Sequence, residues 1–431
     1  MAKIETLRQI LASGEVAGNF GQLYGQRPGF IPRQSARYRA VLERFCAQFP
    51  QHEEAEFFSA PGRTEVGGNH TDHNGGRVLA AAVDLDSLAV VAPNSDGVVR
   101  VHSEGYPTSS VRLDELEAAE SEKNTSTALV RGVCARFKQL GHAIGGFDAT
   151  LTSNVLKGSG LSSSASFEVL VAVILNDLYN HNRIGAMEMA QIGQFSENNY
   201  FGKPCGLMDQ TAVAVGGFCT IDFRDFTRPL IRKVNFDFAA SGFSMVIVDT
   251  GGNHADLTAD YEAVEREMKD VARALGGRVL REFSKERVLR EISFLRTRVN
   301  DRAILRAVHF FDDDQRVAGQ VEALEQNEFQ RFLTLIIESG YSSWRLCQNC
   351  LLNHRFEEQG ITLGLTVSEN ILKGRGAWRV HGGGFAGTIQ AFVPADLVEA
   401  YLSQMRDIFG PEACHELMVR PLGATHVTMT E

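Results

Sequence analysis

The sequence predicts an α+β fold with two domains, and three observations lead to this prediction. The chain has 431 residues, and at roughly 100–200 residues per domain this length predicts two or three domains. Strand-like apolar runs dominate residues 56–110, whereas residues from 254 to about 375 read mostly as charge-rich helices. The composition changes just before residue 253, so we expect an N-terminal domain over 1–253 and a C-terminal domain over 254–431.

The chain begins with predicted helices and continues with predicted strands. Two stretches within residues 1–50 have apolar residues at helical spacing. These residues are Ile4, Leu7, Ile10 and Leu11, followed by Tyr38, Val41, Leu42 and Phe45. The apolar runs 78–83 and 87–93 predict two strands that are separated by Asp84 and Asp86. Asn-Ser-Asp-Gly at 94–97 predicts a turn, and residues 125–141 predict a helix.

Further along, the pattern again changes between strands and helices. Residues 147–155 alternate like a strand, and residues 156–179 form a Gly/Ser turn that runs into an apolar helix. Strand-like runs follow at 218–223 and 243–250. After the long helical stretch, residues 377–405 predict a strand, a glycine loop, a second strand and a helix.

Composition and charge exclude several classes of function. There are 43 Lys and Arg against 53 Asp and Glu, a formal net charge of −10, so bulk charge will not hold a nucleic acid. The seven cysteines are odd in number and have no framework spacing, which predicts reduced thiols in the cytoplasm. The N-terminus lacks the apolar core of a signal peptide, and the longest apolar runs are too short for a membrane span. We therefore expect no nucleic-acid partner and no membrane insertion.

A Gly/Ser-rich loop, GSGLSSSAS at 158–166, lies between a predicted strand and a predicted helix. Glycines allow the backbone to approach an anion closely, and the exposed N–H groups of a first helical turn bind anions. Serine hydroxyls add donors, and one of them can ligate magnesium. The loop therefore favours a phosphate site, although a simple serine N-cap remains the alternative. No Gly-Lys-Ser/Thr follows, so this is not a Walker A loop.

A second polar cluster occupies the short Gly-rich stretch 62–77. It contains Arg63, Glu65, Asn69, His70, Asp72, His73 and Asn74. Converging polar groups on a loop suit a small polyhydroxylated ligand, which needs many directional hydrogen bonds. Two alternatives remain: a hydrolase-type metal site built on His70, Asp72 and His73, or a solvated loop with capping side chains.

Two further segments carry candidate chemistry. SENNYFGKPCGLMDQ at 196–210 contains Glu197 and Asp209, and a carboxylate held after a tight turn can serve as a base or a metal ligand, or as a helix cap. GGGFAG at 382–387 matches G-x-G-x-x-G, but too few residues follow to complete a dinucleotide-binding sheet. This glycine loop could instead form one wall of a phosphate site.

Together and in this order, the motifs resemble the galactokinase branch of the small-molecule kinases that include homoserine, mevalonate and phosphomevalonate kinases. PGRTEVGGNHTDHNGG at 61–76 is similar to the galactokinase signature, Pro-Gly-Arg-x-Asn-x-x-Gly-Glu-His-Thr-Asp-Tyr-Asn. GSGLSSSAS, ENNYFGKPCGLMDQ and RVHGGGFAGT resemble the phosphate-binding, catalytic-aspartate and third glycine-rich motifs of that superfamily. The resemblance implies a two-domain small-molecule kinase fold with the active site in the interdomain cleft, and an ATP-dependent, magnesium-dependent sugar 1-kinase.

The resemblance also implies residue roles. Asp209 would accept or orient the proton of the anomeric hydroxyl of the sugar, with Arg63 beside it keeping it ionised. Magnesium would be held by Ser164 and Glu197. The ATP phosphates would contact Gly158, Ser159, Gly160, Leu161, Ser162, Ser163 and Ser164, and the sugar hydroxyls would contact Asn69, His70, Asp72, Gly206 and Tyr261.

The sequence departs from the signature at positions 65, 69 and 73. The family's Asn, Glu and Tyr are Glu65, Asn69 and His73 here. Since the resemblance places position 69 at the C6 end of the sugar, galactose is the expected substrate and a uronate or a pentose is the alternative. A sensor that binds galactose and ATP without catalysis is a further alternative. It is disfavoured by the intact serine loop, Arg63 and Asp209. The oligomeric state is not fixed by the sequence.

Overall fold

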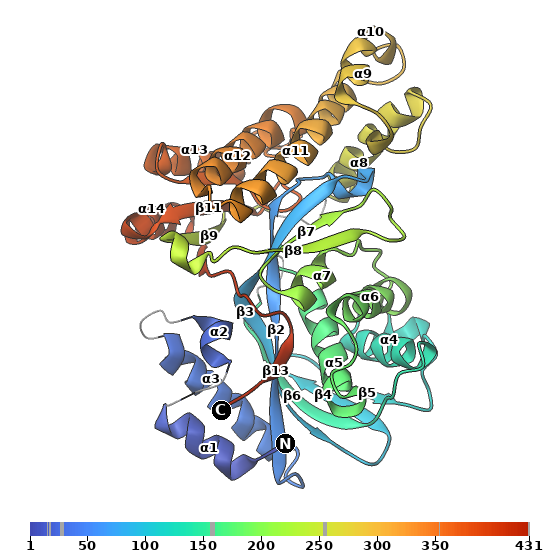
Figure 1. Cartoon of the computed structure of the whole chain (residues 1–431), viewed down its shortest axis with the longest axis vertical. Helices are drawn as coiled ribbons and strands as arrows, with labels where there is room; N and C mark the ends of the chain where they lie inside the picture. Colours follow the sequence, from blue (N-terminus) through green and yellow to red (C-terminus); the bar gives the residue numbers. More distant parts are fainter. Residues whose placement is uncertain are drawn as a thin grey trace.

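The computed structural model describes residues 1–14, 16, 19–25, 30–155, 160–252, 257–352 and 354–429. Within them the chain forms two sheets, and helices cover both (Figure 1). The larger sheet has the strand order β1-β2-β3-β6-β4-β5, with β13 pairing β2 and the β7–β8 pair joining β3. Its strands are β1 (Ala2–Lys3), β2 (Glu54–Gly67), β3 (Arg77–Pro93), β4 (Val98–Ser103), β5 (Ser109–Arg112), β6 (Phe147–Ser153), β7 (Phe218–Asp222), β8 (Leu230–Val234) and β13 (Thr425–Val427).

The smaller sheet is antiparallel and has the order β10-β11-β9-β12. Its strands are β9 (Phe243–Asp249), β10 (Ala377–Val380), β11 (Thr388–Pro394) and β12 (Cys414–Leu417). Strand β9 precedes residue 253, yet it pairs with strands from the last quarter of the chain. The division into domains 1–253 and 254–431 stays a prediction.

The helices of the described residues lie mostly where the sequence predicts them. They are α1 (Ile4–Ser13), α2 (Phe20–Tyr24), α3 (Phe30–Gln48), α4 (Ser126–Gln139), α5 (Ser163–Asn180), α6 (Ala186–Ser196), α7 (Met208–Val215), α8 (Thr258–Ala274), α9 (Lys285–Arg290), α10 (Ile292–Leu295), α11 (Asp301–Glu325), α12 (Phe329–Ser342), α13 (Gly360–Leu372) and α14 (Val398–Phe409). No helix in the described ranges has a long enough apolar stretch to cross a bilayer.

A long antiparallel hairpin, β2–β3, runs through the middle of the molecule (Figure 1). We expected two strands separated by Asp84 and Asp86, and this was wrong, because β3 continues through both residues. The Asp84 carboxylate accepts a hydrogen bond from the backbone N–H of Met418 at 2.8 Å, and Asp86 is enclosed by side-chain donors and cations. Both carboxylates therefore have partners inside the fold, and the strand continues through them, with a register shift in its pairing to β2 at residues 84 and 85.

Alternate residues of this hairpin face two different cores. Phe57 and Val90 pack with α1–α3, whereas Phe58 and Val91 pack with α4–α6 on the opposite face. Figure 1 shows α1–α3 on one side of β2 and α4–α7 on the other. Because side chains alternate along a strand, an almost continuously apolar strand is the expected result of burial on both faces.

Beyond its midpoint, the same hairpin packs against the smaller sheet. A third core joins Leu79 and Val83 of β3 to Met245 of β9, Phe392 of β11 and Phe332 of α12. The two sheets therefore share one buried interior, and β2–β3 carries side chains from one sheet to the other. The loop between β2 and β3, residues 68–76, lies at this end of the hairpin.

A buried polar network fixes the helices α2 and α3 to the larger sheet. Asp86 is fully buried; it accepts a hydrogen bond from the Tyr24 hydroxyl at 2.5 Å and pairs with Arg37 at 2.5 Å. The Arg420 guanidinium, also fully buried, lies 3.6 Å from the same carboxylate. Burial opposes ionisation, but the charges of Arg37 and Arg420 outweigh it and lower the pKa of Asp86.

We expect Asp86→Asn to cost roughly 3–5 kcal/mol of the free energy of unfolding, because two guanidinium groups lose their buried partner. Since the pKa of Asp86 is lowered on folding, its contribution is present above the unfolded pKa and is lost as pH falls through the folded value. The variant should therefore show a shallower loss of stability on acidification. Urea unfolding at several pH values measures both effects. Arg8→Ala, which breaks an exposed pair with Glu43, is the control and should cost at most about 1 kcal/mol.

Candidate active site

The proposed catalytic pair, Arg63 and Asp209, is in direct contact. Arg63 lies on β2, and its Nε donates to Asp209 Oδ1 at 2.7 Å while Nη2 lies 2.6 Å from the same oxygen. Asp209 is the second residue of α7, in the first helical turn, where a carboxylate is favoured by the helix dipole. The Arg63 side chain is 11% exposed and that of Asp209 is 29% exposed, so the pair is accessible from one side.

The Gly/Ser loop reaches the same pair. Arg63 Nη1 donates to the carbonyl of Gly160, and the Arg63 backbone N–H donates to the carbonyl of Leu161 at 3.1 Å. The Ser162 hydroxyl donates to Asp209 Oδ2. Ser162 has φ of 57°, a left-handed conformation that is unusual for a residue with a side chain. This turn starts α5 directly beside Asp209, so the first N–H groups of an 18-residue helix open toward the site.

The proposed magnesium ligands lie together behind this turn. Ser164, on the first turn of α5, donates its hydroxyl to Glu197 Oε1 at 3.0 Å. Glu197 is buried and begins a π-helical turn, Glu197–Phe201, that continues α6. Such turns often occur at functional sites. Mg²⁺ prefers hydroxyl and carboxylate oxygens as ligands, so Ser164 and Glu197 fit the ion. Lys203 Nζ also lies 3.5 Å from Glu197 Oε1.

Gln210 connects Glu197 to a second buried carboxyl, Glu168. Gln210 Nε2 donates to Glu197 Oε2 at 2.8 Å and to Glu168 Oε2 at 3.0 Å. Burial, reinforced by the charge of Glu197, raises the pKa of Glu168 well above its ordinary value. Glu168 Oε1 and Gln210 Oε1 are buried without a hydrogen-bond partner among the described residues. A protonated Glu168 carboxyl can donate a hydrogen bond to an unpaired acceptor such as an amide oxygen. The neutral form of Glu168 therefore fits this buried environment.

The loop 68–76, which we call the sugar loop, carries the proposed sugar contacts His70 and Asp72. His70 Nε2 donates to the carbonyl of Gly383 at 2.9 Å. Asp72 begins a short 3-10 turn, Asp72–Asn74, and burial raises its pKa. The nearby charge of Asp209 adds to that rise, while His70 opposes it. Asp72 and Asp209 are thus two electrostatically interacting acidic groups, which come from segments far apart in the sequence.

Asn69 is fully buried, and all four hydrogen-bonding positions of its amide are occupied. Its Nδ2 donates to Glu65 Oε1 at 3.1 Å and to the carbonyl of Gly382 at 2.7 Å. Its Oδ1 accepts from the Ser343 hydroxyl at 3.1 Å and from Asn349 Nδ2 at 2.8 Å. A contact between Asn69 and a sugar stays a prediction, and it requires one of these four bonds to be exchanged.

Glu65, the other departure from the signature, is paired with a cation. Arg379 of β10 is fully buried, and its Nη2 lies 3.0 Å from Glu65 Oε1. Burial raises the pKa of Glu65, although the charge of Arg379 opposes the shift. The signature has an amide at 65 and a carboxylate at 69, and here the two groups have changed places while remaining hydrogen-bonded to each other. The carboxylate thereby lies next to Arg379.

The third glycine-rich motif forms the loop between β10 and β11 and packs on the sugar loop. Tyr261 of α8 donates its hydroxyl to the carbonyl of Gly384 at 3.0 Å. A Cβ at Gly383 would lie 2.5 Å from the Tyr261 ring, so this close approach requires glycine. His381 Nε2 and the Thr64 hydroxyl share a hydrogen bond at 2.9 Å. Burial lowers the pKa of His381 to about 3.

The remaining predicted residues are placed as follows. Gly158 and Ser159 lie outside the described residues. Ser163 is the first residue of α5. Gly206 is exposed, lies two residues before the start of α7, and has open space where a side chain would be. The roles assigned to these residues, like those of the whole set, stay predictions.

The alternative of a hydrolase metal site has little support from the geometry. In the described part of the chain, no group of three or more His, Cys, Asp and Glu side chains is placed to hold a metal. The His70 ring is bonded to a carbonyl, and burial lowers the pKa of His73 to about 3. His73 Nδ1 lies 2.9 Å from the amide nitrogen of its neighbour Asn74.

Sequence reasoning missed several residues that support the site. Arg379, Asn349 and Ser343 hold Glu65 and Asn69, and His381 connects the glycine loop to β2. His381 stands directly before three glycines, and Lys203 stands between Glu197 and Asp209, so both could have been noticed. Ser343 and Asn349 lie in a segment without a chemical motif and had no such signal.

Comparisons with known proteins identify the class first. The model described as "GHMP kinases N terminal domain" matches residues 128–217, and the model described as "Galactokinase galactose-binding signature" matches residues 43–93. The fold is that of the GHMP kinases: a mevalonate kinase from Methanococcus jannaschii superposes with a TM-score of 0.60 at 14% identity, covering 85% of this chain and 98% of that one. The predicted fold class, a GHMP-type small-molecule kinase fold, is confirmed.

The relatives then identify the family. The galactokinase of Streptomyces coelicolor is 32% identical over 372 residues, which cover 86% of this chain and 92% of that protein. The galactokinase of Bacillus subtilis is 30% identical over 69% of this chain and 76% of that protein. A Lactococcus lactis galactokinase complexed with galactose superposes with a TM-score of 0.75 at 25% identity, covering 91% of this chain and all of that chain. The chain belongs to the galactokinase family.

The exchange of carboxylate and amide between positions 65 and 69 predicts that the two residues are energetically coupled. Asn69→Glu alone places a second carboxylate beside Glu65, and like charges about 4 Å apart at an effective dielectric of about 20 repel by roughly 4 kcal/mol before relaxation. We expect the variant to lose about 2–4 kcal/mol of the free energy of unfolding.

The double variant Glu65→Asn/Asn69→Glu again has one carboxylate and one amide, so the repulsion is removed and part of this loss should be recovered, while Arg379 still lacks its buried partner. Urea unfolding of wild type, both single variants and the double variant gives the coupling free energy. Additive effects of the two substitutions would show that positions 65 and 69 act independently.

Proposed function

We propose that this protein transfers the γ-phosphoryl group of ATP to the anomeric hydroxyl of D-galactose, giving galactose 1-phosphate. The observation that carries the proposal is the accessible Arg63–Asp209 pair, which contacts the Gly/Ser loop at the start of α5 and whose carboxylate interacts electrostatically with Asp72 of the sugar loop 68–76. The similarity to galactokinases over most of the chain supports galactose as the substrate.

Asp209 orients the attacking hydroxyl in this mechanism. Arg63 occupies one carboxylate oxygen, and among the described residues the Ser162 hydroxyl alone donates to the other. The anomeric hydroxyl of the sugar can replace Ser162 as the donor to Asp209 Oδ2. The Arg63 guanidinium pairs with the Asp209 carboxylate and offsets charge that develops on the transferred group. Because phosphoryl transfer has a loose transition state, positioning and electrostatics supply most of the acceleration.

The Gly/Ser loop and the start of α5 bind the ATP phosphates. Serine hydroxyls and the free N–H groups of the first helical turn are the donors. Ser164 and Glu197 hold Mg²⁺, which neutralises phosphate charge when bound. Lys203, 3.5 Å from Glu197, adds positive charge beside the phosphates. The enzyme belongs to the reducing cytoplasm in this proposal, and the seven cysteines without disulfides support that place.

Selectivity at C6 of the sugar depends on Asn69 in this proposal. A carboxylate at this position would repel a sugar carboxylate, whereas an amide does not. The amide is also fully engaged with protein groups, so a 6-hydroxyl gains a partner at position 69 only by displacing one of them. Related sugars, namely galacturonate, arabinose and 6-deoxygalactose, are therefore the first alternatives to compare with galactose.

The decisive experiment is a coupled assay of ADP release with Mg-ATP and a panel of galactose, galacturonate, arabinose, 6-deoxygalactose, glucose, homoserine and mevalonate. Galactose should give the highest kcat/KM. Binding of galactose and ATP without release of ADP would instead identify a non-catalytic sensor, and preference for another sugar would replace galactose as the substrate.

Asp209→Asn should lower kcat about 10²–10⁴-fold, because a positioned proton acceptor is lost. The amide keeps the size of the side chain, so galactose and ATP should still bind within a few-fold of wild type. ADP release and calorimetric binding measure the two effects. A kcat close to that of wild type would contradict the catalytic role of Asp209.

Ser164→Ala should raise the magnesium concentration needed for half-maximal activity and weaken productive ATP binding, because the proposed metal site loses one hydroxyl ligand. Glu197 loses a donor at 3.0 Å at the same time. Magnesium titrations of the ADP-release assay measure the shift. Ser110→Ala, an exposed serine of β5, is the control. Superimposable titrations of wild type and Ser164→Ala would remove Ser164 from the metal site.

A further inference from the structure

A cationic cavity lies on the outer side of the sugar loop and is not part of the site described above. It has a volume of about 500 Å³, within the range of small-molecule sites. The lining residues are Arg224, Phe226, Lys269, Arg278, Val279, Arg281 and Glu282. Four of the seven side chains are cationic and one is acidic. In a chain of net charge −10, such a cavity is a local positive feature that favours an anion.

The charges of the cavity are only partly neutralised by the protein. Arg281 pairs with Asp222 and Asp314, and Lys269 pairs with Glu265. In the described residues, the guanidinium of Arg224 has no ion-pair partner. The neighbouring Arg278 is 95% exposed and lies 3.7 Å from Glu282.

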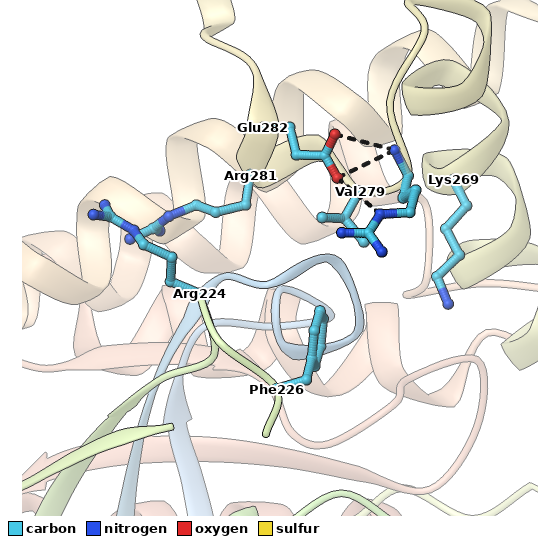
Figure 2. Close-up of a pocket in the computed structure, with 7 residues that line it drawn as sticks. Arg224, Phe226, Lys269, Val279, Arg281 and Glu282 are labelled. Carbon is cyan, nitrogen blue, oxygen red and sulfur yellow. Dashed lines mark hydrogen bonds and ion pairs between the residues drawn. The ribbon is translucent and has the colours of Figure 1, made fainter. Parts of the chain in front are cut away.

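The cavity also has an apolar wall. Phe226 is 52% exposed, which is unusual for a phenylalanine, and Val279 lies opposite it across the cavity. Figure 2 shows Arg224 and Arg281 on one side, Lys269 on the other, and the Phe226 ring between them in this view. Guanidinium groups bind phosphate oxygens in a bidentate manner, and an aromatic face packs against the carbon skeleton of a ligand. The combination suits a phosphate attached to a small organic group.

Three contacts connect the cavity walls to the sugar loop. The backbone N–H of Leu280 donates to Asn74 Oδ1 at 3.3 Å, and that of Phe223 donates to the carbonyl of Gly76 at 3.1 Å. A Cβ at Gly75 would lie 3.2 Å from Cβ of Arg281, so the loop and the Arg281 side chain are in close contact. The end of the sugar loop therefore contacts Arg281, which lines the cavity, and Leu280 and Phe223, which are the chain neighbours of lining residues.

We propose that this cavity binds a phosphate monoester of a small metabolite and that the bound ester changes the affinity of the neighbouring site for sugar. A phosphate group that draws Arg224, Arg278 and Arg281 together changes the environment of residues 74–76. Because these residues continue the loop that holds the proposed sugar contacts, the effect falls on the KM for sugar rather than on kcat. Only this coupling rests on the proposed function, whereas binding of the ester does not.

The test is calorimetric titration of the full-length protein with galactose 1-phosphate, AMP and inorganic phosphate, each in the presence of saturating non-hydrolysable ATP analogue and galactose. The variant is Arg224→Glu/Arg278→Glu, with Arg224→Glu as the milder form. Arg228→Glu, an exposed arginine of the same loop that does not line the cavity, is the matched control. Thermal unfolding confirms that each variant is folded.

We expect at least one ester to bind wild type more tightly than inorganic phosphate does, because Phe226 and Val279 contact its organic part. The double variant should bind that ester at least about tenfold more weakly, and Arg228→Glu should match wild type. The tighter of the two esters identifies the source of the ligand as a sugar phosphate or a nucleotide. That ester should also change the KM for galactose in wild type and leave it unchanged in the double variant.

Three results would overturn the proposal. The first is that both esters fail to bind, and the second is that inorganic phosphate binds as tightly as both esters. The third is that Arg228→Glu weakens binding as much as the double variant does, which would indicate bulk charge alone. Since calorimetry needs no turnover, a failure of galactose phosphorylation leaves the binding result intact. An ester that binds at the cavity without changing the KM would overturn only the coupling.

Discussion

The contacts of Arg63 are the interaction on which the arrangement of the site depends. Its guanidinium bonds to Asp209 on α7 and to the carbonyl of Gly160, and its backbone N–H bonds to Leu161. One residue of β2 therefore sets the distance between the proposed base and the loop at the start of α5. Removing the guanidinium would leave Asp209 without its cation and the Gly160 carbonyl without its donor, whereas the backbone bond to Leu161 would remain. The side chain and the backbone of one residue therefore act together at this point of the site.

The second sheet is positioned by polar contacts to the strand that carries Arg63. The Thr64 hydroxyl contacts His381 and accepts from Gln390, and Glu65 pairs with Arg379. These contacts join the central hairpin to β10 and β11. A series of packed and hydrogen-bonded groups thus runs from the smaller sheet to the sugar loop. This series explains why the third glycine-rich motif, more than 300 residues from Arg63 in the sequence, lies beside the sugar loop.

The parts of the site that sequence reasoning found are those with local patterns. The Gly/Ser turn before α5 and the alternation in β6 were predictable, because helix starts and strands have short-range signals. The strand break at Asp84 and Asp86 was wrongly expected, since the buried partners Tyr24, Arg37 and Arg420 are remote in sequence. The surroundings of Asn69 were equally hidden, because three of its four partners come from two segments that are remote in sequence, at 343–349 and at 382.

The exchange of groups at positions 65 and 69 follows from the cost of burying charge. A buried carboxylate needs a cation and hydrogen-bond donors. Arg379 is fully buried and reaches position 65, whereas position 69 is surrounded by two donors, a carbonyl and the Glu65 carboxylate. An amide fits position 69 because it can donate to the carbonyl and to Glu65 while accepting from Ser343 and Asn349. A carboxylate there could accept but not donate, so Gly382 and Glu65 would both lose a partner. Given Glu65 at the first position, the amide at the second is the residue that satisfies every neighbour, and the two departures from the signature are physically one change.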